Sequence, residues 1–179
     1  NQDFAQARKW YTKAAEQGNA EAQVNLALMY DHGDGVKQDF AQALKWYTKA
    51  AEQGDAGAQN NLGIMYENCK GVNQDFAQAL KWYTKAAEQG DTAAQNNLAL
   101  MFDTGKGVKQ DIVRALKWYT KAAEQGDAEA QSNLGIMYDH GRGVNQDFAQ
   151  ARKWYTKAAE QGDADAQNNL GNMYENGKG

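Results

Sequence analysis

The hydrophobic positions of this chain recur at a fixed interval of 36 residues. The decapeptide KWYTKAAEQG occurs five times without change, beginning at Lys9, Lys45, Lys81, Lys117 and Lys153. A second apolar block follows with the same step and is marked by a leucine, at Leu26, Leu62, Leu98, Leu134 and Leu170. Strict repetition at this period is typical of arrays in which each unit packs on its neighbours. We therefore predict a repeat protein.

The first half of one unit, residues 55–90, has the pattern of an amphipathic helix, here called helix A. Asp55 follows a glycine and precedes an alanine-rich run, so it is expected to cap the helix, which should end near Asn68. Apolar residues at i, i+4, i+7 and i+8 form one face of this helix. They are Ala58, Leu62, Met65 and Tyr66.

The second half of the unit predicts another helix, helix B, after a short connection over residues 69–74. Asp75 and Gln78 have the spacing of a capping box, and Gly90 stands where a left-handed residue would end the helix. The apolar face has residues at i, i+3, i+7 and i+10, which are Phe76, Ala79, Tyr83 and Ala86. Neither helix can bury its apolar face alone, so successive pairs should stack.

These periods predict an all-α fold, a single solenoid array of helix-turn-helix repeats over residues 1–179. The segments expected are a helix B at 3–17, complete repeats at 19–54, 55–90, 91–126 and 127–162, and a helix A at 163–176. Because each end opens in mid-repeat, we expect a fragment of a longer array whose end helices could drive end-to-end self-association. Small residues should let helix A approach helix B closely, at Ala27, Gly63, Ala99, Gly135 and Gly171.

Composition narrows the classes of function. The formal net charge is −4 and the pI is about 5.2, which disfavours nucleic-acid binding because that needs a clustered basic surface. The sequence has no apolar run long enough to insert into a membrane. Its one cysteine, Cys69, excludes an internal disulfide.

The repeated motif resembles the Sel-one-like repeat (SLR) family, a relative of the tetratricopeptide repeats. Residues 56–90 match nearly every position of the pattern A-x-A-Q-x-x-L-G-x-M-Y-x-x-G-x-G-V-x-x-D-x-x-x-A-x-x-W-Y-x-K-A-A-x-x-G. The resemblance implies a right-handed α/α superhelix with A helices on the concave side, common in bacteria, and a role as adaptor or scaffold. One cysteine-rich bacterial branch is linked to penicillin binding and β-lactamase activity, but it carries paired cysteines.

Differences between the repeats concentrate in helix A, and by the resemblance this face lines the concave groove. Beside the varying positions runs an unvarying ladder of asparagines, whose amides can both donate and accept hydrogen bonds. The ladder could equally bond a neighbouring backbone inside the stack, and that alternative stays open. The candidate partner-binding residues are the ladder Asn25, Asn61, Asn97, Asn133 and Asn169, the adjacent Asn60 and Asn96, the apolar Leu28, Ile64, Leu100 and Ile136, and the acidic Glu67, Asp103 and Asp139.

Other chemistry-bearing residues favour structural roles. The recurring tryptophans fall on or beside the apolar face of helix B, so core packing is expected rather than ligand stacking. His32 and His140 are three repeats apart, which predicts no shared metal. Cys69 stands where the other repeats carry glycine, and a left-handed backbone there would strain it. No nucleophile with a matching base is visible.

We therefore predict a protein–protein interaction scaffold that binds a partner peptide or protein on the concave A-helix face. Apolar anchors together with Lys or Arg would suit its apolar stripe and acidic edge. The prediction includes no enzymatic activity, no cofactor and no metal. The alternatives are an enzyme of the β-lactamase or penicillin-binding type, and a structural spacer or consensus-like array without a specific ligand.

Overall fold

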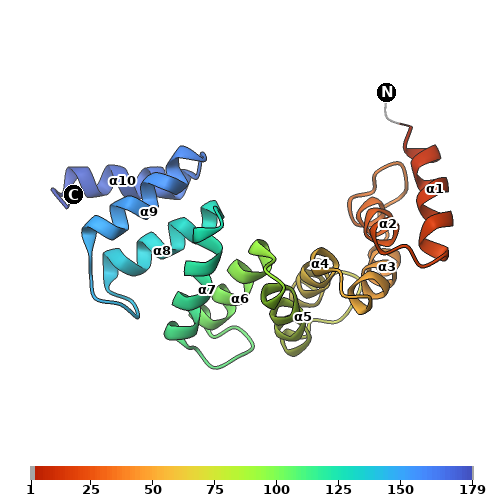
Figure 1. Cartoon of the computed structure of the whole chain (residues 1–179), viewed down its shortest axis with the longest axis horizontal. Coiled ribbons are helices and arrows are strands. Elements are labelled where there is room, and N and C mark those ends of the chain that lie inside the picture. The colour runs from red at the N-terminus through yellow and green to blue at the C-terminus, as the bar shows by residue number, and fades with distance from the viewer. Residues whose placement is uncertain (1–2, 179) are drawn as a thin grey trace. The chain divides into compact units, whose positions relative to one another are not determined.

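A computed structural model describes residues 3–178, and these residues form ten α-helices and no β-strand (Figure 1). The A helices alternate with the B helices along the chain, as the repeat pattern predicts. The B helices are α1 (Phe4–Glu16), α3 (Phe40–Glu52), α5 (Phe76–Glu88), α7 (Ile112–Glu124) and α9 (Phe148–Glu160). The A helices are α2 (Ala20–His32), α4 (Ala56–Glu67), α6 (Thr92–Thr104), α8 (Ala128–His140) and α10 (Ala164–Glu175).

The chain divides into two compact units, residues 1–91 with α1 to α5 and residues 92–179 with α6 to α10. Within each unit, consecutive helices pack against one another around a core of small and aromatic side chains. None of the helices in residues 3–178 is both long enough and apolar enough to cross a membrane.

The helix ends follow the capping residues of the sequence. Asp55 Oδ1 accepts a hydrogen bond from the backbone N–H of Ala58 at 2.7 Å, and Asp75 Oδ1 accepts one from Gln78 at 3.0 Å. These side chains satisfy amide groups that have no partner inside the helix. After α5, Gly90 takes a left-handed φ of +96°, which glycine tolerates without steric cost. The predicted helix limits are confirmed at both ends of this repeat.

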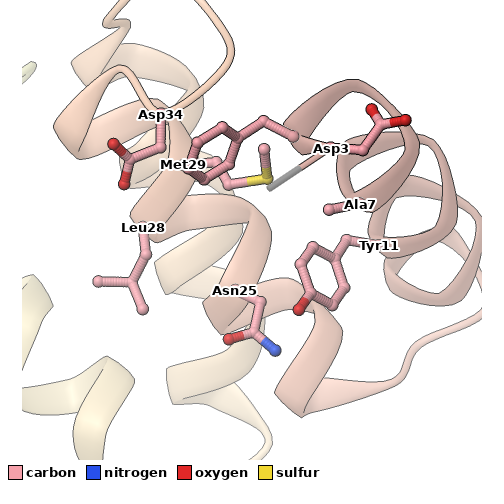
Figure 2. A pocket seen from close by; sticks show the side chains of 8 residues that line it. Asp3, Ala7, Tyr11, Asn25, Leu28, Met29 and Asp34 are labelled. Atoms are coloured by element: carbon pink, nitrogen blue, oxygen red, sulfur yellow. The ribbon is translucent and has the colours of Figure 1, made fainter. Parts of the chain in front are cut away.

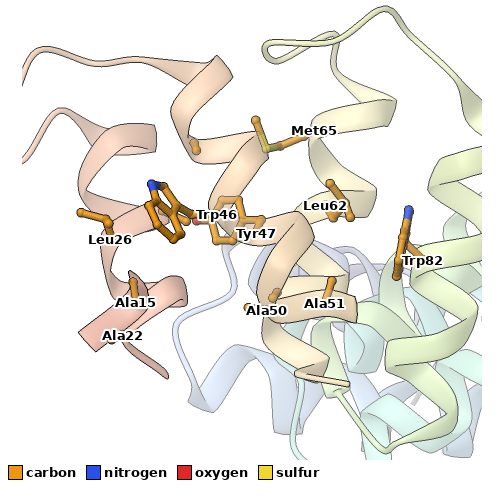
Figure 3. Close-up of a cluster of buried hydrophobic side chains, with 13 residues drawn as sticks. Ala15, Ala22, Leu26, Trp46, Tyr47, Ala50, Ala51, Leu62, Met65 and Trp82 are labelled. Atoms are coloured by element: carbon orange, nitrogen blue, oxygen red, sulfur yellow. The ribbon is translucent and has the colours of Figure 1, made fainter. Parts of the chain in front are cut away.

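The core of the first unit is built from A and B helices together (Figure 3). Tyr47 of α3 and Leu62 of α4 are fully buried in the same cluster, and Trp46 is 6% exposed. Trp82 and Trp154 are buried to the same degree, which confirms that these tryptophans pack in the core. Trp10 differs, because 60% of its surface is exposed on α1.

Helix A approaches helix B most closely at its small residues. A β-carbon at Gly63 would lie 2.6 Å from Cδ1 of Tyr83, and one at Gly135 would lie 2.5 Å from the same atom of Tyr155. Real side chains do not come that close, so glycine is what permits this spacing. The expected close approach is confirmed at these two positions.

A buried glutamine in α2, α4 and α8 bonds both to the preceding and to the following helix B segment, and it was not among the residues expected from the sequence. Gln59 of α4 donates from Nε2 to the backbone oxygen of Ala51 in α3, at 3.0 Å. Its Oε1 accepts from Gln89, just after α5, at 2.8 Å. In the second unit Gln131 bonds Ala123 and Gln161 in the same way. Such paired buried amides fix the stacking register of successive helices.

Candidate functional site

The varying positions of helix A occupy two different faces. Helical spacing places residues 21, 25, 28 and 32 on one face and residues 24, 27 and 31 on another, about a quarter turn away. The first set is exposed or half-buried, whereas the second turns toward the following helix B. Only the first face is therefore available to a partner, and we call it the A-helix surface. In each repeat it carries a ladder asparagine followed, three residues later, by the residue equivalent to Leu28.

The apolar members of the A-helix surface are accessible. Leu100 is 37% exposed, and Leu28, Ile64 and Ile136 are half-buried. The last residue of this surface, equivalent to His32, is exposed in every repeat. These residues are His32, Asn68, Thr104, His140 and Asn176.

Asn60 and Asn96 were expected to belong to this surface, and that expectation is wrong. They are 7% and 4% exposed. Asn60 shares its face of α4 with Gly63, which lies against the Tyr83 ring, so the face packs on α5. In α4 and α6 the side chain at this position is covered by the protein itself.

The acidic residues Glu67, Asp103 and Asp139, expected as one edge of the groove, also lie on the packed face. In α4, Glu67 Oε2 accepts a hydrogen bond from the hydroxyl of Tyr83 in α5 at 2.7 Å. In the second unit Asp103 Oδ1 lies 2.6 Å from Nη2 of Arg142, and its side chain is only 13% exposed. These carboxylates pair with other side chains of the same protein. The expectation of a free acidic edge is therefore wrong.

For Asp31, Asp103 and Asp139 the pairing partner comes from the loop of the next repeat, 39 residues onward. Asp31 lies 3.6 Å from Nζ of Lys70, and Asp139 lies 3.9 Å from Nζ of Lys178. The Asp31 and Asp139 side chains are 14% and 15% exposed. Half-buried ion pairs of this kind join consecutive repeats and favour one register between them.

A buried tyrosine lies beside each of Asp31, Glu67, Asp103 and Asp139. Burial raises the pKa of the Tyr83 hydroxyl strongly, and its hydrogen bond to the Glu67 carboxylate raises that pKa further. Burial likewise raises the pKa of Tyr47 and of Tyr155, with an added contribution from the charges of Asp31 and Asp139. These phenols therefore stay neutral around pH 7, and the Tyr83 hydroxyl serves as a structural hydrogen-bond donor.

The asparagine ladder is half-buried along its whole length. At two places it reaches the wall of a pocket. Asn169 and Asp139 come together in a polar pocket of about 180 Å³ between α8 and α10, with His140 and Asn172. Asn25 and Leu28 line a larger, more apolar pocket of about 390 Å³ between α1 and α2 (Figure 2). The ladder residues Asn25 and Asn169 therefore border open space in these pockets.

The remaining candidates do not form a reactive centre. Cys69 is exposed and has a left-handed φ of +57°, where the other repeats have glycine, so the expected strain is present. Ser132 is 4% exposed within the helix stack. Across residues 3–178, no group of three His, Cys, Asp or Glu side chains is arranged to hold a metal ion.

The Sel1 repeat motif matches the chain from one end to the other, over residues 1–19, 20–55, 56–91, 92–127, 128–163 and 164–179. The chain belongs to the Sel1 repeat family. Members of this family generally act as protein-interaction scaffolds. The matched frames differ by one residue from the repeat limits that the capping residues predict.

Solved structures of Sel1 repeat proteins share the fold. A protective antigen of uropathogenic Escherichia coli with an SLR fold is 44% identical, with a TM-score of 0.91 over 98% of this chain. A Sel1 repeat protein from Oxalobacter formigenes is also 44% identical, with a TM-score of 0.88 over 93% of this chain. This chain spans 38% of the first protein and 68% of the second.

An immunity protein from Pseudomonas aeruginosa, PA5088, is more distant. It is 29% identical, with a TM-score of 0.64, and the alignment covers 93% of this chain and 60% of that protein. No curated protein sequence matches the chain.

Proposed function

We propose that this Sel1 repeat chain is an interaction scaffold whose partner, a protein or peptide, binds the A-helix surface. The observation that carries the proposal is the repeated pairing of an amide with an accessible aliphatic side chain. Asn97 and Leu100 illustrate it, three residues apart on one face of α6, with Leu100 37% exposed. The same pair recurs in α2, α4 and α8 as Asn25 with Leu28, Asn61 with Ile64, and Asn133 with Ile136.

The chemistry of this surface suits an extended or helical segment with aliphatic anchors. The amides offer both donors and acceptors to a partner backbone, and the aliphatic side chains supply the apolar contact. Asp103 and Asp139 are excluded from this role because cations of the protein already lie beside them. The proposal therefore no longer includes Lys or Arg side chains in the partner for this surface.

The experiment selects peptides from a phage-displayed library on the wild-type chain and measures their affinity for single variants. Leu100→Asp places a charge on the A-helix surface and should weaken the selected peptides at least about tenfold. Val113→Asp is the matched control, because Val113 is 69% exposed on helix B α7. It should leave peptide affinity unchanged. Thermal melts followed by circular dichroism show whether both variants stay folded.

The opposite pattern would overturn the proposal. If Val113→Asp abolishes binding and Leu100→Asp does not, the partner uses the B-helix side. If no peptide is selected and the chain captures no protein, the chain is a structural spacer. The β-lactamase alternative has no supporting feature in residues 3–178, where Cys69 is exposed and free. Turnover of nitrocefin by the purified chain would revive that alternative.

A further inference from the structure

The solvent-exposed side of the B helices carries two lysines one helical turn apart. Residues at i and i+4 are neighbours on a helix surface, about 6 Å apart along its axis. All these lysines are exposed, and we call them the lysine rows. The pairs are Lys45 with Lys49 in α3, Lys81 with Lys85 in α5, Lys117 with Lys121 in α7, and Lys153 with Lys157 in α9.

In the first unit, each pair of the lysine rows lies over one buried tryptophan. The Nζ atoms of Lys45 and Lys49 are 5.2 Å and 4.6 Å from the centre of the Trp46 ring. The pair of α5 lies over Trp82 in the same way, at 5.1 Å and 4.7 Å. Trp46 and Trp82 belong to one core cluster (Figure 3) and are 6% and 7% exposed. This surface therefore offers a partner the ammonium groups rather than the rings.

The charges of the lysine rows are not neutralised by the protein itself. Within residues 3–178, none of these ammonium groups lies within 4 Å of a carboxylate oxygen. By contrast, the loop cations Lys70 and Arg142 lie beside Asp31 and Asp103. Like charges at i and i+4 repel each other and lower helix stability, and the ring beneath them offsets only part of that cost. The pairs are therefore available to an anionic partner.

A glutamate near the end of each B helix limits what such a partner can be. Glu52 follows Lys49 by three residues and is exposed, and Glu88 follows Lys85 in the same way. A wide anionic surface, such as a membrane or a nucleic-acid duplex, would meet these carboxylates as well as the lysines. A narrow acidic segment that passes from α3 to α5 over the lysines would avoid them. Charge complementarity thus favours a narrow partner.

We propose that the lysine rows are a second docking surface, which binds an acidic segment of another protein. Asp or Glu side chains of that segment pair with Lys45 and Lys49 on α3 and with Lys81 and Lys85 on α5. Each carboxylate also relieves the repulsion within a lysine pair, so that the charges act as a network rather than as isolated surface ion pairs. The lysine rows lie on the B helices, so this proposal is independent of the A-helix surface.

The test measures binding of a fluorescent oligoglutamate peptide by anisotropy at about 0.15 M salt. Lys49→Gln together with Lys85→Gln should weaken binding about fivefold, whereas arginine at both positions should preserve it. The matched control is Lys37→Gln together with Lys109→Gln, which changes the net charge equally at exposed loop lysines. It should bind like the wild type. An oligoglutamine peptide should not bind, and circular dichroism melts show whether each variant stays folded.

A second measurement needs no variant. Acetylation of the wild-type chain by acetic anhydride, followed by mass spectrometry, should be slowed by oligoglutamate at the lysine rows and unchanged at Lys37. Failure of oligoglutamate to bind, an equal loss in the loop control, or equal protection of Lys37 would overturn the proposal.

Two other anionic probes distinguish the class of partner. Tighter binding of phosphatidylserine vesicles or of a single-stranded oligonucleotide, lost in the Lys49→Gln and Lys85→Gln chain, would overturn the proposal because the surface would then serve a membrane or a nucleic acid. Leu100→Asp should leave oligoglutamate binding unchanged, so that this proposal and the proposed function can fail separately.

Discussion

The hydroxyl of Tyr83 donates a hydrogen bond of 2.7 Å to Glu67 Oε2 and so ties α5 to α4 within one repeat. In the preceding repeat the equivalent pair is Tyr47 and Asp31, and the shorter aspartate does not reach the hydroxyl. Tyr47 Oη and Asp31 Oδ1 are both buried without a hydrogen-bond partner. The hydrogen bond between tyrosine and carboxylate therefore forms in one repeat and is missing in the other, where the acidic side chain is shorter by one methylene group.

Asp31→Glu should complete this missing bond. We expect the free energy of unfolding to rise by about 1 kcal/mol, since a buried donor and acceptor would both gain a partner. Urea denaturation measures the change. In a Tyr47→Phe background the same substitution should bring no gain. A gain of equal size in that background would mean that Glu acts through Lys70 rather than through the phenol.

Stability should fall as the pH rises above about 10. Burial raises the pKa of Tyr47, Tyr83, Tyr119 and Tyr155 above the ordinary value for tyrosine. The unfolded chain releases these protons near pH 10 while the folded chain holds them. The contribution of these four phenols to the free energy of unfolding is thus fully present below pH 10 and is lost progressively above it.

Tyr83→Phe isolates one of these phenols. It should make the fall in unfolding free energy above pH 10 shallower by about 1.4 kcal/mol per pH unit. Tyrosinate absorbance, followed together with circular dichroism, reports ionisation and unfolding at once. Ionisation of all four phenols in a chain that keeps its helical signal would contradict this account.

Gly63→Leu should destabilise the protein by about 2–3 kcal/mol or more, because the new side chain would overlap the Tyr83 ring. The matched control is Gly171→Leu. It changes the same repeat position in α10, where a β-carbon would meet nothing within 4 Å. Thermal melts of the two variants should differ clearly. Equal losses would show that helix packing at Gly63 is looser than the distance implies.

Cys69→Gly should stabilise the protein by about 1 kcal/mol. Cys69 has a φ of +57°, a region that costs a residue with a β-carbon about 1–2 kcal/mol and glycine little. Part of the gain is offset because glycine has more freedom in the unfolded chain. Cys69→Ala keeps the β-carbon and should bring no comparable gain. Urea midpoints of the two variants check this, and a larger midpoint for alanine would refute it.

The helices and their limits were predictable because their signals are local. Asp55, Asp75 and Gly90 act on backbone groups within a few residues, so sequence spacing identifies them. The position of Asn60 was not predictable in the same way. Its face of α4 is buried by α5, and only the packing direction of helix A on helix B distinguishes that face from the A-helix surface.

The sequence by itself determined the 36-residue repeat, the alternation of A and B helices and the apolar face of each, because periodicity and capping are local properties of the chain. Only the tertiary structure decided which polar residues pair with other residues of the same protein. Asp103 forms an ion pair with Arg142, 39 residues away, and Gln59 accepts a hydrogen bond from Gln89, 30 residues away. Such pairings depend on how one repeat stacks on the next. The same stacking decides which amides and aliphatic side chains remain accessible on the surface of helix A.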